Sequence, residues 1–125
     1  MKRNHGHQMN AFLGKDSEFE GKLSFTGTVR VDGRVKGEIL SEGTLIVGET
    51  AFLDSEVRVG ELIVSGEVHG SIVATERIEI RAPGRVFGSI QSPVVSIEEG
   101  VIFEGTCRMQ KRTERANQKI AVLQQ

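Results

Sequence analysis

The chain has 125 residues, which is one domain on the usual scale of about 100–200 residues per domain. It has 15 glycines, no Trp or Tyr and a single cysteine, a composition that favours a thin aliphatic core and excludes an intrachain disulfide. The net charge is −1, but residues 19–107 hold 14 acidic against eight basic side chains, which argues against nucleic acid as a partner of that segment.

Residues 1–18 carry basic side chains but no apolar run of the length that a signal peptide or a membrane helix requires. We therefore predict a cytoplasmic protein with a flexible N-terminal tail over residues 1–18. A short apolar cluster beside a lysine makes this tail a candidate for contact with the inner face of the cell membrane. The members of this cluster are Met9, Ala11, Phe12, Leu13 and Lys15.

A nine-residue phrase recurs through the middle of the chain. VDGRVKGEI at 31–39 returns as VSGEVHGSI at 64–72, and the partial copy RVFGSI follows at 85–90. Cutting the sequence at this phrase gives five units of roughly 16–18 residues, and a shorter piece at 18–22 resembles the end of an earlier unit. The five units are 23–39, 40–57, 58–72, 73–90 and 91–107.

Apolar and polar residues alternate within each unit, and Val and Ile dominate the apolar positions. A period of two predicts short strands with one buried face, and the Gly, Ser, Asp and Glu residues between the strands predict corners. Equivalent positions form three columns. They are the runs 29–31, 45–47, 62–64, 78–80 and 95–97; the apolar set Val35, Ala51, Val68, Val86 and Phe103; and the glycines Gly37, Gly70, Gly88 and Gly105.

Short strands with a period near 17 residues predict an all-β fold, a single-domain β-helix of five to six coils with three short strands per coil. We expect it to be right-handed, because a left-handed hexapeptide helix would keep a stricter six-residue rhythm. Each coil buries its apolar face only against its neighbours, which stack about 4.8 Å apart. The predicted domain spans residues 19–107, and a basic flexible tail follows over 108–125.

The end coils of such a solenoid should expose the apolar interior and unpaired strand edges. They are therefore the predicted polymerisation interface. Its residues are Phe19, Leu23 and Phe25 at the N-terminal end and Val101, Ile102 and Phe103 at the C-terminal end.

One outward column is aromatic. Phe52, His69 and Phe87 are expected at equivalent places in three successive coils and form a candidate partner surface, unless a register shift of one residue turns them inward. We predict no catalytic residue, no metal site and no cofactor. The chain has no G-x-x-x-x-G-K-[ST] loop, and a single solenoid histidine cannot supply the three ligands of a catalytic zinc.

The stretch AFLGKDSEFEGKLSFTGTVRVDGRVKGEI at 11–39 and the closing run GVIFEG at 100–105 resemble the bactofilins, a polymer-forming bacterial cytoskeletal family. The resemblance covers residues 19–107. It implies a right-handed β-helix that assembles end to end, without nucleotide, into non-polar filaments. It also implies a scaffold at the inner face of the bacterial membrane that positions cell-wall enzymes and shape-determining or polar proteins.

We therefore expect a cytoskeletal scaffold whose partners are further copies of itself, the inner membrane surface and cell-wall or polar proteins, with no nucleic acid bound by the solenoid. Two alternatives remain open. One is an enzyme related to solenoid acyltransferases that uses His69, and the other is a nucleic-acid or membrane binder that uses the basic tail. Filaments that form without any ligand would favour the scaffold, whereas a discrete trimer would favour the acyltransferase.

Overall fold

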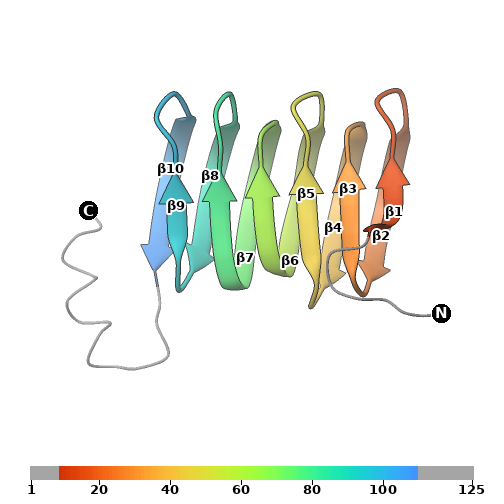
Figure 1. The fold of residues 1–125 in the computed structure, drawn as a ribbon, viewed down its shortest axis with the longest axis horizontal. Helices are drawn as coiled ribbons and strands as arrows, with labels where there is room; N and C mark the ends of the chain where they lie inside the picture. The colour runs from red at the N-terminus through yellow and green to blue at the C-terminus, as the bar shows by residue number, and fades with distance from the viewer. Residues whose placement is uncertain (1–8, 110–125) are drawn as a thin grey trace.

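The computed structural model describes residues 9–109, which form ten strands and no helix. Every strand pairing is parallel, and the ten strands make one sheet that winds into a β-helix of six coils. In Figure 1 the chain rises along the front strands, crosses at the top and descends behind as it advances toward the C-terminus. This is the right-handed sense, so the predicted fold is confirmed.

The strands fall into three groups by length. Four are short, namely β1 (Met9–Leu13), β3 (Thr28–Val31), β5 (Thr44–Val47) and β9 (Val95–Ile97). Four have eight residues each, namely β2 (Glu18–Phe25), β4 (Arg34–Ser41), β8 (Arg85–Ser92) and β10 (Ile102–Met109). The two longest are β6 (Phe52–Val64) and β7 (Glu67–Ile80).

Each coil has three faces, which we number in chain order. Face 1 comprises residues 11–13, 29–31, 45–47, 62–64, 78–80 and 95–97. Face 2 comprises residues 18–20, 34–36, 52–54, 67–69, 85–87 and 102–104. Face 3 comprises residues 22–24, 38–40, 56–58, 71–73, 89–91 and 106–108.

The first coil is more complete than the sequence predicts. Strand β1 pairs in parallel with β3, so residues 11–13 hold the same places as 29–31 in the next coil. The β-helix therefore begins at Met9 rather than at residue 19, and β10 carries it to Met109. The sequence hides this strand because its apolar residues lack the Val and Ile of the later copies. The remaining parts of the two predicted tails, 1–8 and 110–125, lie outside the described residues.

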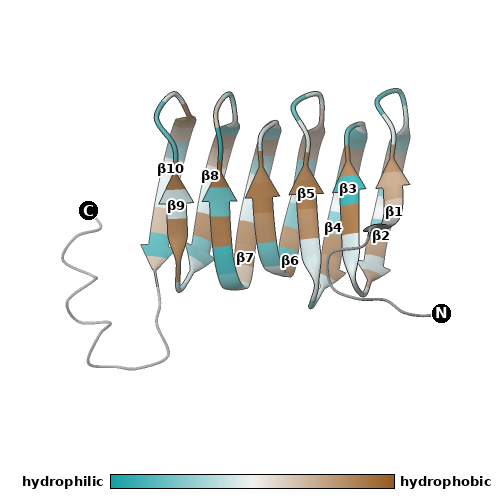
Figure 2. Ribbon diagram, viewed as in Figure 1, coloured by the Kyte–Doolittle hydropathy of each residue, from teal (hydrophilic) through white to brown (hydrophobic). Residues whose placement is uncertain are grey.

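The core is a narrow aliphatic column along the axis. Its buried apolar side chains are Val, Ile, Leu and Ala only, and Figure 2 shows the apolar residues following one another from coil to coil along the front strands. On face 1, Val31, Val47, Val64 and Ile80 stack in register and are all fully buried. Because each coil covers the next, the repeated phrase in the sequence is the repeated layer of this core.

The inward column of face 2 differs from the prediction in the third coil. Leu53, not Ala51, pairs with Val35 on one side and with Val68 on the other. The corner after β5 contains four residues, 48–51, whereas the corner after β3 contains two. Ala51 is buried within that longer corner. The sequence did not separate the two alignments because Ala51 and Leu53 are both apolar and lie two residues apart.

A column of glycines makes the bend between faces 2 and 3. Gly37, Gly70 and Gly88 have φ angles of 129°, 133° and 132°, a region that side chains disfavour. A Cβ on Gly88 would also lie 2.0 Å from the carbonyl oxygen of Gly70 in the neighbouring coil. The predicted glycine column is thus required twice, by the backbone conformation and by the close stacking. In the third coil Ser55 takes this place and donates a hydrogen bond to the Val35 carbonyl at 3.2 Å.

Candidate functional site

The two ends of the β-helix have strand edges without a partner. At the N-terminal end β1 pairs only with β3 and β2 only with β4, and at the C-terminal end β9 pairs only with β7 and β10 only with β8. Within residues 9–109, each of these four strands therefore leaves one row of N–H and C=O groups unpaired by another strand. Such a row is a template for a further strand.

Large side chains close the core at the N-terminal end. Phe19, Leu23 and Phe25, the predicted interface residues, are half-buried and pack on the core. Phe19 lies in register with the fully packed Val35 and has no coil on its other side within the described residues. Leu13 of β1 belongs to the same layer. A further coil stacked on this end would bury these side chains completely.

The C-terminal end divides its predicted residues between the core and the rim. Phe103 is half-buried, lies in register with Val86 and faces inward, and Val101 packs on the core from the preceding corner. Ile102 points outward instead, and 46% of it is exposed. Ile97 is also 46% exposed although it continues the inward column of Ile80, because no coil within residues 9–109 covers it.

The predicted interface omits four end residues, and one of them, Leu13, was predicted to contact the membrane instead. Val95, Ile97 and Cys107 are the last members of inward columns at the C-terminal end, and Leu13 is the first member of one at the N-terminal end. The first three could have been found by reading each column to its last copy. Leu13 could not, because it was placed in the tail.

Cys107 behaves as part of the apolar end. It pairs with Ile90 on face 3 and packs on the core. Burial raises the pKa of its thiol above the ordinary value, because the thiolate loses hydration there. Cys107 therefore contributes a small, partly buried side chain to the apolar C-terminal end.

The predicted aromatic surface exists as a stack of rings on face 2. The ring centroids of Phe52 and His69 are 5.1 Å apart, and those of His69 and Phe87 are 4.7 Å apart. The guanidinium carbon of Arg34 lies 5.4 Å from the centroid of Phe52. The predicted equivalence was wrong for Phe52, because Asp54 is the register partner of His69. The four-residue corner again shifts the register by two, and the Phe52 ring reaches His69 diagonally.

His69 also contacts a carboxylate on the same face. Its Nε2 lies 2.7 Å from a carboxylate oxygen of Glu67, and the other oxygen of Glu67 lies 3.7 Å from Nη1 of Arg85. These contacts, together with the rings of Phe52 and Phe87, place His69 in a packed cluster on the outside of the solenoid. Among the described residues no group of three His, Cys, Asp or Glu side chains could hold a metal ion.

The residues predicted to contact a membrane are divided by the fold. Leu13 is half-buried against the core, whereas Ala11, Phe12 and Lys15 are exposed. Phe12 is exposed by 56% and points outward from face 1, and the backbone of Met9 pairs with β3. Over residues 9–109 there is no helix of the length and hydropathy that crossing a membrane would need.

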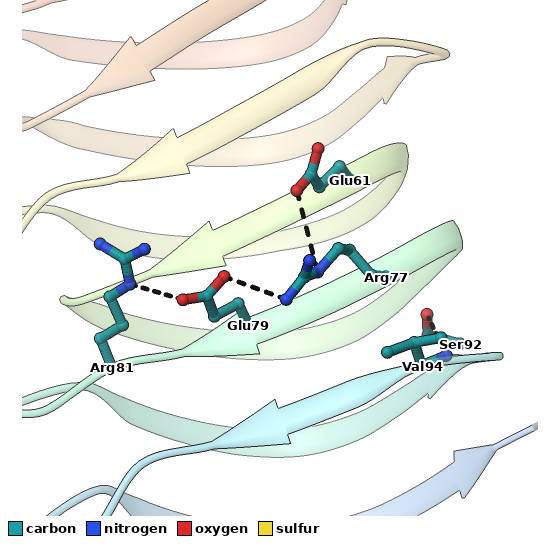
Figure 3. Close-up of polar contacts among 6 residues, drawn as sticks. All are labelled: Glu61, Arg77, Glu79, Arg81, Ser92 and Val94. Carbon is teal, nitrogen blue, oxygen red and sulfur yellow. Dashed lines mark hydrogen bonds and ion pairs between the residues drawn. The ribbon is translucent and has the colours of Figure 1, made fainter.

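Charges on face 1 are matched within the chain. Glu79 accepts hydrogen bonds from Arg81 at 2.7 Å and from Arg77 at 3.3 Å, and Arg77 Nε lies 3.9 Å from Glu61 (Figure 3). Beyond this network the Ser92 hydroxyl accepts from the Val94 amide at 3.4 Å. The arginines are about half exposed, so each pair contributes at most about 1 kcal/mol.

A β-helix with an apolar, unpaired edge at each end defines a protein that associates with copies of itself. Comparison with known proteins agrees with this class. The family model described as "Bactofilin: Polymer-forming cytoskeletal" matches residues 11–108. The chain belongs to the bactofilin family, and the resemblance found in the sequence is confirmed.

Two curated relatives come from Myxococcus xanthus (strain DK1622). Bactofilin BacP is 38% identical over 100 residues, which cover 80% of this chain and 42% of BacP. Bactofilin BacO is 28% identical over 100 residues, which cover 80% of this chain and 79% of BacO. The chain thus spans less than half of BacP and most of BacO.

Two solved structures are also similar. The cryo-EM reconstruction of Thermus thermophilus bactofilin double helical filaments has a TM-score of 0.76 and 32% identity, covering 80% of this chain and 99% of that one. The structure of the cytoskeletal bactofilin BacA from solid-state NMR has a TM-score of 0.70 and 30% identity, and the match covers 82% of this chain and 98% of that one.

Proposed function

We propose that this chain is a structural cytoskeletal scaffold that assembles end to end, without nucleotide, into non-polar filaments, in which like ends meet. The observation that carries the proposal is the pair of apolar ends, each with strand edges that lack a partner. Docking a second end covers the edges and the core side chains at once. The role is that of a polymer rather than an enzyme, and it requires no active site at His69.

The side chains at the ends are large enough to support this association. Burying one large apolar side chain contributes about 1.5–3 kcal/mol. Phe19, Leu23 and Phe25 at one end and Val101, Phe103 and Cys107 at the other are already half-buried, so each gains part of that amount. Two docked ends bring about six such side chains together, and their burial contributes at most about 9–18 kcal/mol, which is of the same order as an association cost of about 4–15 kcal/mol. No nucleotide energy is needed.

Non-polar assembly follows if each end joins its own kind. Each end presents an apolar surface of its own, with Phe19 and Phe25 at one and Phe103 and Ile97 at the other. A surface of this kind can meet its copy through a two-fold axis. A variant blocked at one end should then stop as a dimer.

We further propose that the filament lies at the inner face of the cell membrane and positions cell-shape or cell-wall machinery. The exposed ring of Phe12 and the exposed Lys15 support this, since both project from the first coil. One such anchor is weak and reversible, but a filament presents many linked copies and gains in avidity.

We also propose that two filaments of this chain pair side by side. The Thermus thermophilus relative forms double helical filaments, and the likeness to it covers 80% of this chain. This supports lateral pairing as a second level of assembly.

Electron microscopy of the purified full chain, with and without ATP or GTP, tests the polymer. Filaments of equal length and number are expected in both samples, and a stable monomer or a discrete trimer would contradict the proposal. For the membrane, co-sedimentation with anionic vesicles should fall when Phe12→Ser is introduced. The control Val94→Ser removes an apolar side chain at the other end that is 45% exposed, against 56% for Phe12, and should pellet like the wild type. Equal pelleting of the two variants would contradict a role for Phe12 in membrane binding.

A further inference from the structure

Face 2 carries a ridge of aromatic side chains along the helix axis, followed by one aliphatic side chain. Phe52, His69 and Phe87 stack across the third to the fifth coils. In the sixth coil the same face presents Ile102, which is 46% exposed. Because successive coils are about 4.8 Å apart, the ridge runs parallel to the direction in which the protein would polymerise.

The first three coils of face 2 carry charged side chains that form no ion pair within the described residues, although the guanidinium of Arg34 lies over the ring of Phe52. Glu18 and Glu20 lie in the first coil, Arg34 and Lys36 in the second, and Asp54 in the third. Together with Phe52 they line a shallow depression of about 500 Å³. No ion pair joins any of these five to another residue in the part of the chain that the structure describes, in contrast to the matched arginines of face 1.

We propose that face 2 is the lateral surface of the filament and that its occupant is face 2 of a second copy of this chain. The inference rests on the filament proposed above and names the surface through which two filaments pair. Two outward columns define the contact. The first is Glu18, Arg34, Phe52, Glu67, Arg85 and Ile102, and the second is Glu20, Lys36, Asp54, His69, Phe87 and Glu104.

The order of charges in these columns favours one alignment of two parallel copies placed face to face. When the second copy is rotated by a half-turn about a line parallel to the β-helix axis, its second column lies against the first column of the first copy. With no stagger Glu18 would face Glu20 and Arg34 would face Lys36, so like charges would meet. A stagger of one coil, about 4.8 Å, sets Arg34 against Glu20 and Lys36 against Glu18.

The same stagger matches the rest of the face. It sets Asp54 against Arg34, Glu104 against Arg85, and Ile102 against the ring of Phe87 on the partner copy. One like-charged pair remains, Glu67 against Asp54. Within its own chain Glu67 already contacts His69 and Arg85, which weakens that repulsion. The charge order therefore favours two parallel copies offset by one coil.

The contact between two copies is small, so we expect it to form only between filaments and not between single protomers. Five spacings of about 4.8 Å give a length of about 24 Å, and three residues of strand give a width of about 10 Å. The area is on the order of 250 Å² per copy, against about 800 Å² in a standard interface. Single protomers should therefore not pair, whereas filaments pair through many linked contacts. Because the facing charges are exposed, salt should separate paired filaments.

Charge reversal on the full-length chain tests the face. The variants are E18K/E20K, R34E/K36E and all four changes together, and the readout is the fraction of filament length that is paired in electron micrographs at low salt. The control E38K/E56K makes the same charge change as E18K/E20K, but on face 3. Each double variant on face 2 should lower the paired fraction at least about tenfold, since like charges then face each other. The control should stay paired. The fourfold variant should recover pairing only in part, because it restores the two exchanged pairs but sets R34E against Asp54 of the partner copy.

A second variant, F87S/I102S, leaves the charges unchanged and should also give single filaments. Pairing in this variant and in both double variants overturns the inference, as do single filaments of the wild type at low salt. Neither result affects end-to-end assembly. The absence of any wild-type filament would instead contradict the proposed function itself.

Discussion

Replacing Phe103 by Arg should block assembly at the C-terminal end while the protomer stays folded. The Phe103 side chain faces inward in the last coil and has a neighbouring coil on one side only. Losing its apolar contact at the joint costs about 1.5–3 kcal/mol. An unpaired charge buried at the joint adds about 3–5 kcal/mol. The sum, about 4.5–8 kcal/mol, lowers the association constant by about 10³–10⁶-fold.

Sedimentation velocity and electron microscopy of Phe103→Arg at micromolar concentration measure this effect. In a non-polar filament the intact N-terminal ends still join, so the expected species is a dimer with β-rich circular dichroism. Thr106→Arg is the matched control, since Thr106 is exposed in the same coil on face 3 and gains the same charge. This control should form filaments like the wild type.

Two results would refute parts of this reasoning. Filaments of Phe103→Arg would show that the C-terminal end is not an assembly surface. Monomers in place of dimers would agree with the C-terminal end as an assembly surface but would refute the non-polar arrangement. In a head-to-tail filament every joint uses one C-terminal end, so blocking that end prevents every joint.

Three further predictions concern the other end, the bend and the thiol. Leu23→Arg should likewise give dimers, joined through their C-terminal ends, and sedimentation of this variant checks it. In the Leu23→Arg background, in which the N-terminal ends stay free, Gly88→Ala should lower the urea unfolding free energy by more than about 3 kcal/mol, because it adds a backbone clash to the strain of positive φ. Gly21→Ala has the same strain with open space around it and should cost only about 1–2 kcal/mol, so equal losses would remove the stacking argument. Because the pKa of Cys107 is raised, its thiolate forms at higher pH, and its iodoacetamide rate at pH 8 should be below that of a free cysteine and lower still in filaments.

The sequence predicts the layers of this fold well because each coil repeats the same chemistry. Equivalent positions stack in register from coil to coil, as the sequence pattern predicts, both for residues 29–31 with their copies and for the glycines from Gly37 to Gly105. Corner lengths are harder to predict from the sequence. A corner of two residues and a corner of four leave the same alternation of apolar and polar residues in the strand that follows. This is why Ala51 was taken for Leu53 and why Phe52 was placed in line with His69.

The ends were predicted in outline because the first and last copies of a column must face a missing neighbour. Phe19, Leu23 and Phe103 lie there as expected. Strand β1 was missed because AFL reads equally as a strand and as an apolar cluster in a tail. Only its pairing with β3 distinguishes the two, and pairing between distant segments is not written in a local pattern.

The axial rise of the protomer in nucleotide-free filaments tests end-to-end assembly most directly. Six coils at about 4.8 Å predict a rise of about 29 Å per protomer, with the strand spacing continued across each joint. A helical reconstruction by cryo-EM measures both quantities. A rise near that value with continuous strand spacing is the expected result, whereas a discrete particle, or filaments joined through the faces with an unrelated rise, would contradict it.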